Sequence, residues 1–479
     1  MSEAAASKVC VRCKVDVVGK PRVKDAKGRY LCRPCFDKAA PEGAKTTRPE
    51  PAAVAADPGT VGPAGEGSIL ARSEILGRDR QLLGHAFTLH AAAAGNVRAR
   101  TERTRGFLDE VLIDTLLDKA AGLLASRTVH VPVWSHSILC PAAARLVGTK
   151  AVLVLRAEAP DAAPSAEILA RAQALQADGL PIALEAHLGT AWFTALAPLA
   201  GTVVVDSASH SPTELRSLAG RLKGESPGMQ WLGWNVATEE DFDYLLRLGC
   251  HGFHGGFVTH REDWSGNRLA PHSLRVARLI NQLRDDTGTR EIAEVLKHDV
   301  ALTYRLLRYV NAVAWGINNP ITSIEHALVV LGNYPLRRWL VLLLFGGARN
   351  SAGASTLMDL ALTRARLMEL LGRDRVSREE CEQLFMLGLF SLIDIIAQVP
   401  LERALGPLKL QPAVADALLS GSGPLADYLL LAQAVERGDE AALAEAGERL
   451  GVGPDELNRL QIEALLWVQA GSAAETSGP

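Results

Sequence analysis

The amino-acid sequence predicts a multidomain chain with a small four-cysteine zinc module, a TIM-like β/α barrel and an all-helical domain, in that order. Two closely spaced CxxC pairs near the start predict the zinc module. Short apolar runs that alternate with amphipathic segments predict the barrel, and continuous helical periodicity after them predicts the helical domain. A chain of 479 residues is long enough to give each larger domain its own core.

Composition and charge narrow the class of protein. Hydrophobic residues make up 48% and charged residues 22%, and the formal net charge is −3 with a pI near 6.5. The whole chain therefore lacks the basic field that drives non-specific nucleic-acid binding. The first residues lack a secretory pattern, and no apolar stretch reaches the roughly 18 residues that a membrane span needs. With four of seven cysteines in one tight pattern, we expect a cytoplasmic, reducing location.

The zinc module is predicted for residues 1–38. Two pairs of thiolates suit tetrahedral Zn²⁺, and four protein ligands leave no open position for chemistry. We therefore expect one structural zinc ion per chain, and the alternative is four free cysteines at this spacing by chance. The expected ligands are Cys10, Cys13, Cys32 and Cys35.

The sequence around the zinc module suggests how it is attached. Residues 39–68 are rich in Ala, Pro and Gly without apolar periodicity, which predicts a flexible linker. Residues 1–50 hold 12 Lys and Arg against six Asp and Glu, so contact with nucleic acid stays open, although no aromatic residues are interleaved for base stacking. At the other end, residues 473–479 are expected to form a disordered tail.

The barrel is predicted for residues 69–265. Repeated β–α units imply a parallel sheet that is closed or nearly closed, and function in such barrels sits at the carboxyl ends of the strands. Only two of the residues expected there are acids, which cannot form a two-metal carboxylate cage. The expected strand-end residues are Pro132, Arg156, Glu185, His187, Asp206, Trp234, Asn235 and His254.

Four blocks of the barrel resemble, in order, the signature blocks of the EAL family of bacterial cyclic di-GMP phosphodiesterases. They are "LARSEILGRDRQLLGHAFTLH", "PIALEAHLGT", "TVVVDSA" and "LGWNVATEEDFDYLLRLGCHGFHGGFV". The resemblance implies a barrel fold and places the metal and catalytic ligands of the family at positions that here carry other side chains. Asp206 and Gly255 persist, whereas the substituted positions are Ala86, Val154, Glu185, Ala186, Val204, Trp234 and His254.

The helical region, residues 266–472, resembles the HDOD domain, a helical relative of HD phosphohydrolases in bacterial signalling proteins. The resemblance rests on the block from "EIAEVLKHDVALTYRLL" to "NYPLRRWLVLLL". It places the His–Asp pair of catalytic relatives near "GLFSLID", where this chain has Ser391 and Leu392, and it implies a structural or interaction role for Asp394. A separate His298–Asp299 pair suits a helix N-cap better than a metal site.

A short connection between barrel and helical domain favours fixed packing of the two. Arg337, Arg338 and Trp339 are residue types that anchor interfaces when partly exposed, so they are candidate interaction residues. The alternative is that Trp339 is core and the arginines are solvated.

Together these observations predict a catalytically inactive signal-transduction or scaffold protein that binds a partner protein of unknown identity. We expect cyclic di-GMP to be left unhydrolysed and to bind weakly if at all. One alternative is a divergent cyclic di-GMP phosphodiesterase or binding effector, which would need a metal site made from Glu185, His187, Asp206 and His254. Another is a nucleic-acid-associated regulator that acts through the zinc module.

Overall fold

The computed structural model describes residues 22–24, 30–32, 68–91, 101–284, 323–344 and 353–476, with the single positions 293, 296, 306 and 321. The chain divides into two compact units, Met1–Val61 and Gly62–Pro479. In the first unit, β1 (Arg22–Lys24) pairs antiparallel with β2 (Tyr30–Cys32). Cys10, Cys13 and Cys35 lie outside the described residues, and only the backbone of Cys32 is described, so the zinc site stays a prediction.

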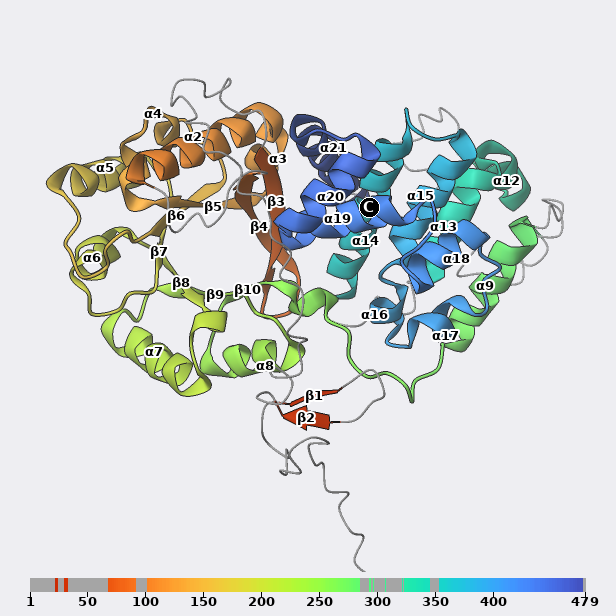
Figure 1. The fold of residues 1–479 in the computed structure, drawn as a ribbon, viewed down its shortest axis with the longest axis horizontal. Coiled ribbons are helices and arrows are strands. Elements are labelled where there is room, and N and C mark those ends of the chain that lie inside the picture. Colours follow the sequence, from red (N-terminus) through yellow and green to blue (C-terminus); the bar gives the residue numbers. More distant parts are fainter. Residues whose placement is uncertain are drawn as a thin grey trace, which may run out of the picture. The chain divides into compact units, whose positions relative to one another are not determined.

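The second unit contains a closed barrel of eight strands (Figure 1). Neighbouring strands follow the order β10-β3-β4-β5-β6-β7-β8-β9 around the barrel. The strands are β3 (Ser68–Gly77), β4 (Leu82–Ala91), β5 (Thr128–Trp134), β6 (Ala151–Arg156), β7 (Ile182–Glu185), β8 (Thr202–Asp206), β9 (Gln230–Trp234) and β10 (Gly252–His254). The prediction of a closed β/α barrel is confirmed.

One strand corrects the prediction of a parallel sheet. β3 runs antiparallel to both of its neighbours, β4 and β10, while the remaining pairs are parallel. Only four residues separate β3 from β4, and so short a connection can join only antiparallel strands. Within this turn the amide of Gly77 donates to the carbonyl of Gln81 at 2.8 Å, and Arg80 adopts a positive φ of 61°.

Side chains alternate along each strand, so that every second one points outward toward the helices and the others point into the lumen of the barrel. Val129, Val131 and Val133 of β5 point outward into the main barrel core, whereas His130 between them faces the other way and is also buried. The covering helices are α2 (Glu102–Lys119), α3 (Ala121–Ser126), α4 (Pro141–Ala144), α5 (Ala166–Ala177), α6 (Ala191–Leu196), α7 (Pro212–Glu225) and α8 (Glu239–Leu248).

The described residues after the barrel form helices, as predicted. They are α9 (Pro271–Arg284), α12 (Ile324–Leu331), α13 (Asn333–Leu344), α14 (Ala354–Gly372), α15 (Arg378–Phe390), α16 (Ile393–Ala397), α17 (Leu401–Leu405), α18 (Pro412–Leu419), α19 (Ala426–Arg437), α20 (Glu440–Leu450) and α21 (Pro454–Thr476). The predicted disordered tail is too long, because α21 continues through residues 473–476 with the helix-favouring sequence "AAET". None of the described helices is both long and apolar enough to cross a membrane.

Helices of the helical domain cover β3. Figure 1 shows α19 and α21 beside this strand, and both contact it. Ile462 and Leu465 of α21 belong to the barrel core, while Ile69 of β3 belongs to a core formed by the helices. The two domains therefore share their apolar cores, which agrees with the fixed packing expected from their short connection.

Two buried amide side chains of α21 bind the backbone of β3 directly. Asn458 accepts a hydrogen bond from the amide of Leu70 at 2.8 Å and donates to the carbonyl of Ser68 at 2.9 Å. Gln461 donates to the carbonyl of Leu70 at 2.8 Å. In this way α21 satisfies backbone groups on the side of β3 that faces away from β4.

Candidate functional site

The carboxyl ends of the parallel strands bring most of the predicted strand-end residues to one mouth of the barrel. Arg156, Glu185, Asp206, Trp234 and His254 are each the last residue of their strand. Pro132 is a correction, because β5 continues two residues further and ends at Trp134. The guanidiniums of Arg105 and Arg156 lie 4.5 and 4.7 Å from the ring centroid of Trp134, so an aromatic side chain takes the place predicted for Pro132.

Apolar side chains fill the lumen just below this mouth. Val154, Ala183 and Val204 are at most 6% exposed and form a separate small core, against which Val152 and Trp234 pack. Val154, Val204 and Trp234 are three of the positions at which the EAL resemblance places catalytic or metal-binding residues. The space between these strands is therefore occupied by hydrocarbon and an indole ring, neither of which can bind a divalent cation.

His254, at the end of β10, is also buried and is held in a fixed position. Its ring stacks on Trp234 with a centroid distance of 3.9 Å, and its Nε2 lies 2.5 Å from the Ser73 hydroxyl. Burial lowers the pKa of His254 to about 3, with a smaller contribution from nearby His130, so the ring is neutral at physiological pH. The next residue, Gly255, has a φ of 143°, and a Cβ there would lie 2.3 Å from the Val236 carbonyl oxygen. Close backbone packing thus explains this glycine.

The two acids at the mouth already have partners. Glu185 lies 3.3 Å from Nε2 of His187, and although burial opposes ionisation, His187 and Arg156 hold its pKa below the ordinary value. Asp206 accepts hydrogen bonds from Ser209 at 2.6 Å and from Asn235 at 2.9 Å. Across the part of the chain that the structure describes, no three His, Cys, Asp or Glu side chains are grouped to hold a metal ion. The donor set at the mouth does not fit the metal cage of the EAL family.

A polar cluster directly after β5 was missed in the sequence analysis. In the short helix η2 (Ser135–Leu139), Nδ1 of His136 lies 2.6 Å from a carboxylate oxygen of Glu158, and Ser135 also donates to Glu158. Burial opposes ionisation of Glu158, but these hydrogen bonds lower its pKa below the ordinary value. A strand end followed at once by "SHS" is a signal that could have pointed to this cluster.

The same cluster contains a buried carboxyl group, Asp109 of α2. It accepts hydrogen bonds from the Trp134 amide at 2.8 Å and the Ser137 hydroxyl at 2.6 Å, and burial raises its pKa to about 6. Because Ser137 is 3% exposed and directs its proton to Asp109, while Nε2 of His136 lies 3.5 Å away, this serine is not arranged as a nucleophile.

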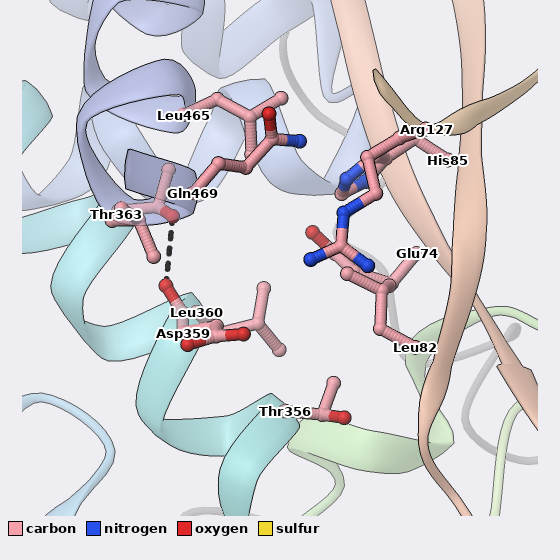
Figure 2. A pocket seen from close by; sticks show the side chains of 11 residues that line it. Glu74, Leu82, His85, Arg127, Thr356, Asp359, Leu360, Thr363, Leu465 and Gln469 are labelled. Carbon is pink, nitrogen blue, oxygen red and sulfur yellow. Dashed lines mark hydrogen bonds between the residues drawn. The ribbon is translucent and has the colours of Figure 1, made fainter. Parts of the chain in front are cut away.

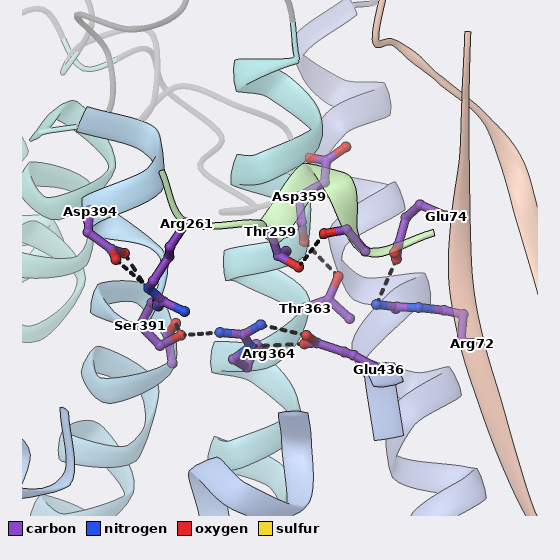
Figure 3. A network of polar contacts seen from close by, with 12 residues as sticks. Arg72, Glu74, Thr259, Arg261, Asp359, Thr363, Arg364, Ser391, Asp394 and Glu436 are labelled. Atoms are coloured by element: carbon purple, nitrogen blue, oxygen red, sulfur yellow. Dashed lines mark hydrogen bonds and ion pairs between the residues drawn. The ribbon is translucent and has the colours of Figure 1, made fainter. Parts of the chain in front are cut away.

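In the helical domain, "GLFSLID" joins a partly buried network of polar contacts (Figure 3). Arg261, in the connection from the barrel, donates to both oxygens of Asp394 at 2.5 and 3.4 Å. Arg364 of α14 donates to the Ser391 hydroxyl at 2.6 Å and to both oxygens of Glu436 on α19, at 2.9 and 2.5 Å. Ser391 and Asp394 are 2% exposed, so this segment supports packing between helices and the connection. His298 and Asp299 lie outside the described residues.

The candidate interaction residues lie on α13 and are tied to the rest of the domain. Trp339 is 4% exposed and belongs to the helical core. Arg338 forms ion pairs with Glu369 at 2.5 Å and Glu382 at 2.6 Å, and Arg337 also has a partner. Trp339 therefore lies in the core, as the alternative reading of the sequence has it, but Arg338 is ion-paired and 21% exposed and is not the solvated arginine of that alternative. An interface at these residues stays a prediction.

Comparison with known proteins gives one family match and two curated relatives. Residues 269–401 match the model of the HDOD domain. "Cyclic di-GMP phosphodiesterase CdgJ" of Vibrio cholerae is 26% identical over 308 residues, which are 64% of this chain and 71% of that protein. "Uncharacterized protein YuxH" of Bacillus subtilis is 27% identical over 243 residues, 50% of this chain and 59% of that protein. The matched part is thus less than two thirds of the Bacillus protein.

Solved structures match 40% of the chain at low TM-scores. The PaMucR phosphodiesterase in complex with c-di-GMP is 15% identical, with 40% of this chain and 94% of that chain covered and a TM-score of 0.33. An EAL domain protein from Listeria monocytogenes is 10% identical, covers 40% of this chain and 87% of its own length, and has a TM-score of 0.31. The HDOD match, the similarity to the Vibrio cholerae protein and the closed eight-stranded barrel together support an EAL–HDOD protein.

Proposed function

We propose that this chain is a signalling protein that acts by binding a partner protein and does not hydrolyse cyclic di-GMP. The apolar core of Val154, Ala183 and Val204 below the barrel mouth carries the proposal. Phosphodiester hydrolysis at such a mouth needs carboxylates that hold divalent cations and activate water, and hydrocarbon cannot supply either. The relation to a protein named a cyclic di-GMP phosphodiesterase and the HDOD match support a role in signalling.

The enzymatic alternative would use Glu185, His187, Asp206 and His254. Two features of the geometry weigh against it. Glu185 and Asp206 are each bound to their own polar neighbours, and His254 lies 8% exposed against the ring of Trp234. Opening this site to a metal and a dinucleotide would require displacement of the Trp234–His254 stack.

A hydrolysis assay with cyclic di-GMP and either Mg²⁺ or Mn²⁺ tests the proposal. We expect turnover no higher than that of the same protein with Asp206→Ala, at several enzyme concentrations. Metal-dependent turnover that Asp206→Ala abolishes would establish the enzymatic alternative instead. Equilibrium binding of cyclic di-GMP, measured in parallel, separates the binding effector from a protein that works only through a partner, because the effector would bind without turnover.

Capture of a partner tests the other half of the proposal, and Arg337 and Arg338 stay candidate contacts. Arg338 also forms ion pairs with Glu369 and Glu382, so its replacement can weaken folding as well as binding. The melting temperature of any variant that loses partner capture must therefore be compared with that of the native protein. Arg337→Glu that abolishes capture with an unchanged melting temperature would support an interface there. Equal losses of capture and folding would assign these residues to core support. Salt-dependent DNA binding by residues 1–50 would favour the nucleic-acid alternative.

A further inference from the structure

A small cavity lies where the helical domain covers β3 and β4 (Figure 2). Side chains from β3, β4, α14 and α21 and the residue that follows α3 line it. Its volume is about 20 Å³, enough for one water molecule or an ion of similar size, since a single water needs roughly 10–15 Å³. The cavity is distinct from the barrel mouth and plays no part in the function proposed above.

Buried polar atoms of two side chains at this cavity lack hydrogen-bond partners among the described residues. His85 of β4 is 1% exposed, and neither of its ring nitrogens is bonded within the described part of the chain. Nε2 of Gln469 on α21 likewise has no partner there, while its Oε1 accepts from Ser126 at 3.4 Å. Buried polar groups are nearly always satisfied by protein, water or an ion. Figure 2 shows both side chains on the border of the cavity, together with Arg127.

Charged groups of both signs lie at the cavity, and those that act on His85 are arginines. The guanidinium of Arg127 lines it and has no ion-pair partner among the described residues. Burial drives the pKa of His85 well below its ordinary value, and the charges of Arg72 and Arg127 lower it further, so this imidazole is neutral in a positive field. Of the two carboxylates at the cavity, Glu74 is paired with Arg72 at 2.9 Å, and Asp359 has a partner of its own.

We propose that this cavity binds a small inorganic anion of about the size of chloride, held by Arg127, a ring N–H of His85 and the Nε2 amide of Gln469. Each of these three groups donates hydrogen bonds, and the unpaired guanidinium supplies the balancing charge. A water molecule accepts at most two hydrogen bonds, so it could not satisfy all three donors, and it would bring no negative charge to Arg127. A tetrahedral oxyanion such as phosphate needs more room than the cavity provides.

The anion would connect the two domains. His85 and Arg127 belong to the barrel, whereas Gln469 belongs to α21, the helix that also binds the backbone of β3. An anion that binds only the docked arrangement stabilises it by mass action. Chloride should therefore raise the melting temperature of the full chain more than a large anion at equal ionic strength.

Thermal unfolding of the dialysed full-length protein in sodium chloride and in sodium gluconate tests this. We expect a saturable, chloride-specific increase of roughly 1–3 °C. Arg127→Gln should remove the difference between the two salts. The matched control is Arg145→Gln, which lies on the barrel surface in an exposed pair with Asp114 and should keep it. No chloride-specific shift in the native protein, or the same shift in Arg127→Gln, would overturn the proposal.

Crystals of the native protein grown in sodium bromide provide a second test that needs no variant. An anomalous peak in the cavity within hydrogen-bond distance of Arg127 and Gln469 is the expected result. Density for a water molecule without an anomalous signal would show that the cavity is only hydrated, and would overturn the proposal even if Arg127→Gln proved too unstable to measure.

Discussion

The barrel mouth and the "GLFSLID" segment differ in what replaces the polar residues of catalytic relatives. The family resemblances place metal ligands near both regions. In the barrel, Val154 and Val204 now form part of an apolar core. In the helical domain, Ser391 and Asp394 are buried but polar, and arginines from α14 and from the domain connection bind them.

This difference decides how each region depends on its neighbours. An apolar replacement needs only close packing, because it leaves no hydrogen-bonding group without a partner. A buried carboxylate such as Asp394 needs a paired charge, so its partner becomes indispensable to the fold. The helical domain should therefore tolerate loss of charge poorly, whereas the barrel lumen should tolerate gain of charge poorly.

The largest expected effect is at Arg364, which binds Glu436 and Ser391 and is 4% exposed. Arg364→Ala leaves Glu436 half-buried without its partner and should lower the free energy of unfolding by about 3–5 kcal/mol. Urea denaturation at pH 7 measures this loss. Arg145→Ala, which breaks an exposed pair, should lose about 1 kcal/mol or less. Similar losses in the two variants would remove the contrast between the buried network and the surface.

Replacing Arg364 and Glu436 together separates the contribution of the ion pair from that of the other hydrogen bonds. In the variant Arg364→Met with Glu436→Leu, no charge stays buried without a partner, so the loss should be smaller than for Arg364→Ala. A loss as large as that of the single variant would mean that the network stabilises the fold through its hydrogen bonds to Ser391 and not through the ion pair.

The next largest expected effect is a loss of stability at acidic pH, caused by a buried histidine in the barrel lumen. Burial lowers the pKa of His130 to about 4, so the folded protein binds this proton less readily than the unfolded chain, whose pKa is near 6.5. Stability from His130 is therefore present above pH 6.5 and is lost as the pH falls toward 4, by about 3 kcal/mol. His130→Leu should flatten this part of the stability profile. An unchanged slope between pH 6.5 and 4 would contradict the prediction.

A smaller effect is expected at Arg338, the sequence candidate for an interface. Its guanidinium lies 3.8 Å from the ring centroid of Phe385, and the side chain is 21% exposed between two glutamates. Burial lowers its pKa, but Glu369 and Glu382 outweigh this and raise the pKa above its ordinary value. Arg338→Ala should lower the free energy of unfolding by about 2 kcal/mol. An unchanged stability, with loss of partner capture, would restore the interface interpretation.

Local sequence patterns predicted the domains because their signals are periodic. Apolar runs such as "TVVVD" predicted β8, and the helical repeats predicted the later helices. Three of the departures from the EAL blocks, Val154, Val204 and Trp234, proved to lie in or against the apolar core of the lumen. The antiparallel strand β3 escaped the β–α pattern because it is paired through a hairpin. Pro132 was placed at a strand end because "VPVW" gives no turn signal before Trp134.

Long-range contacts could not be predicted in the same way. Asn458 and Gln461 bind Leu70 across nearly the whole chain, and in sequence they are ordinary polar residues of an amphipathic helix. The cavity at His85 arises only where α21 meets β4. Whether such a polar residue has a hydrogen-bond partner depends on how the two domains pack together, and local sequence patterns carry no information about that packing.

The smallest effect on the second unit is expected from loss of the predicted zinc site, and this change tests the comparison most directly. Cys32→Ser removes one of the four expected thiolates from the first unit, Met1–Val61, so the protein should lose its single zinc ion. The melting transition of Gly62–Pro479 should stay within about 1 °C, because Cys32 belongs to the other compact unit and not to the apolar cores of Gly62–Pro479. Metal analysis of native protein and of the variant, purified side by side, measures the outcome. If manganese is bound, or if zinc remains bound after Cys10, Cys13, Cys32 and Cys35 have all been replaced by serine, the barrel or the helical domain holds a metal, and the contrast between a hydrocarbon-filled mouth and a charge-paired network no longer accounts for both regions.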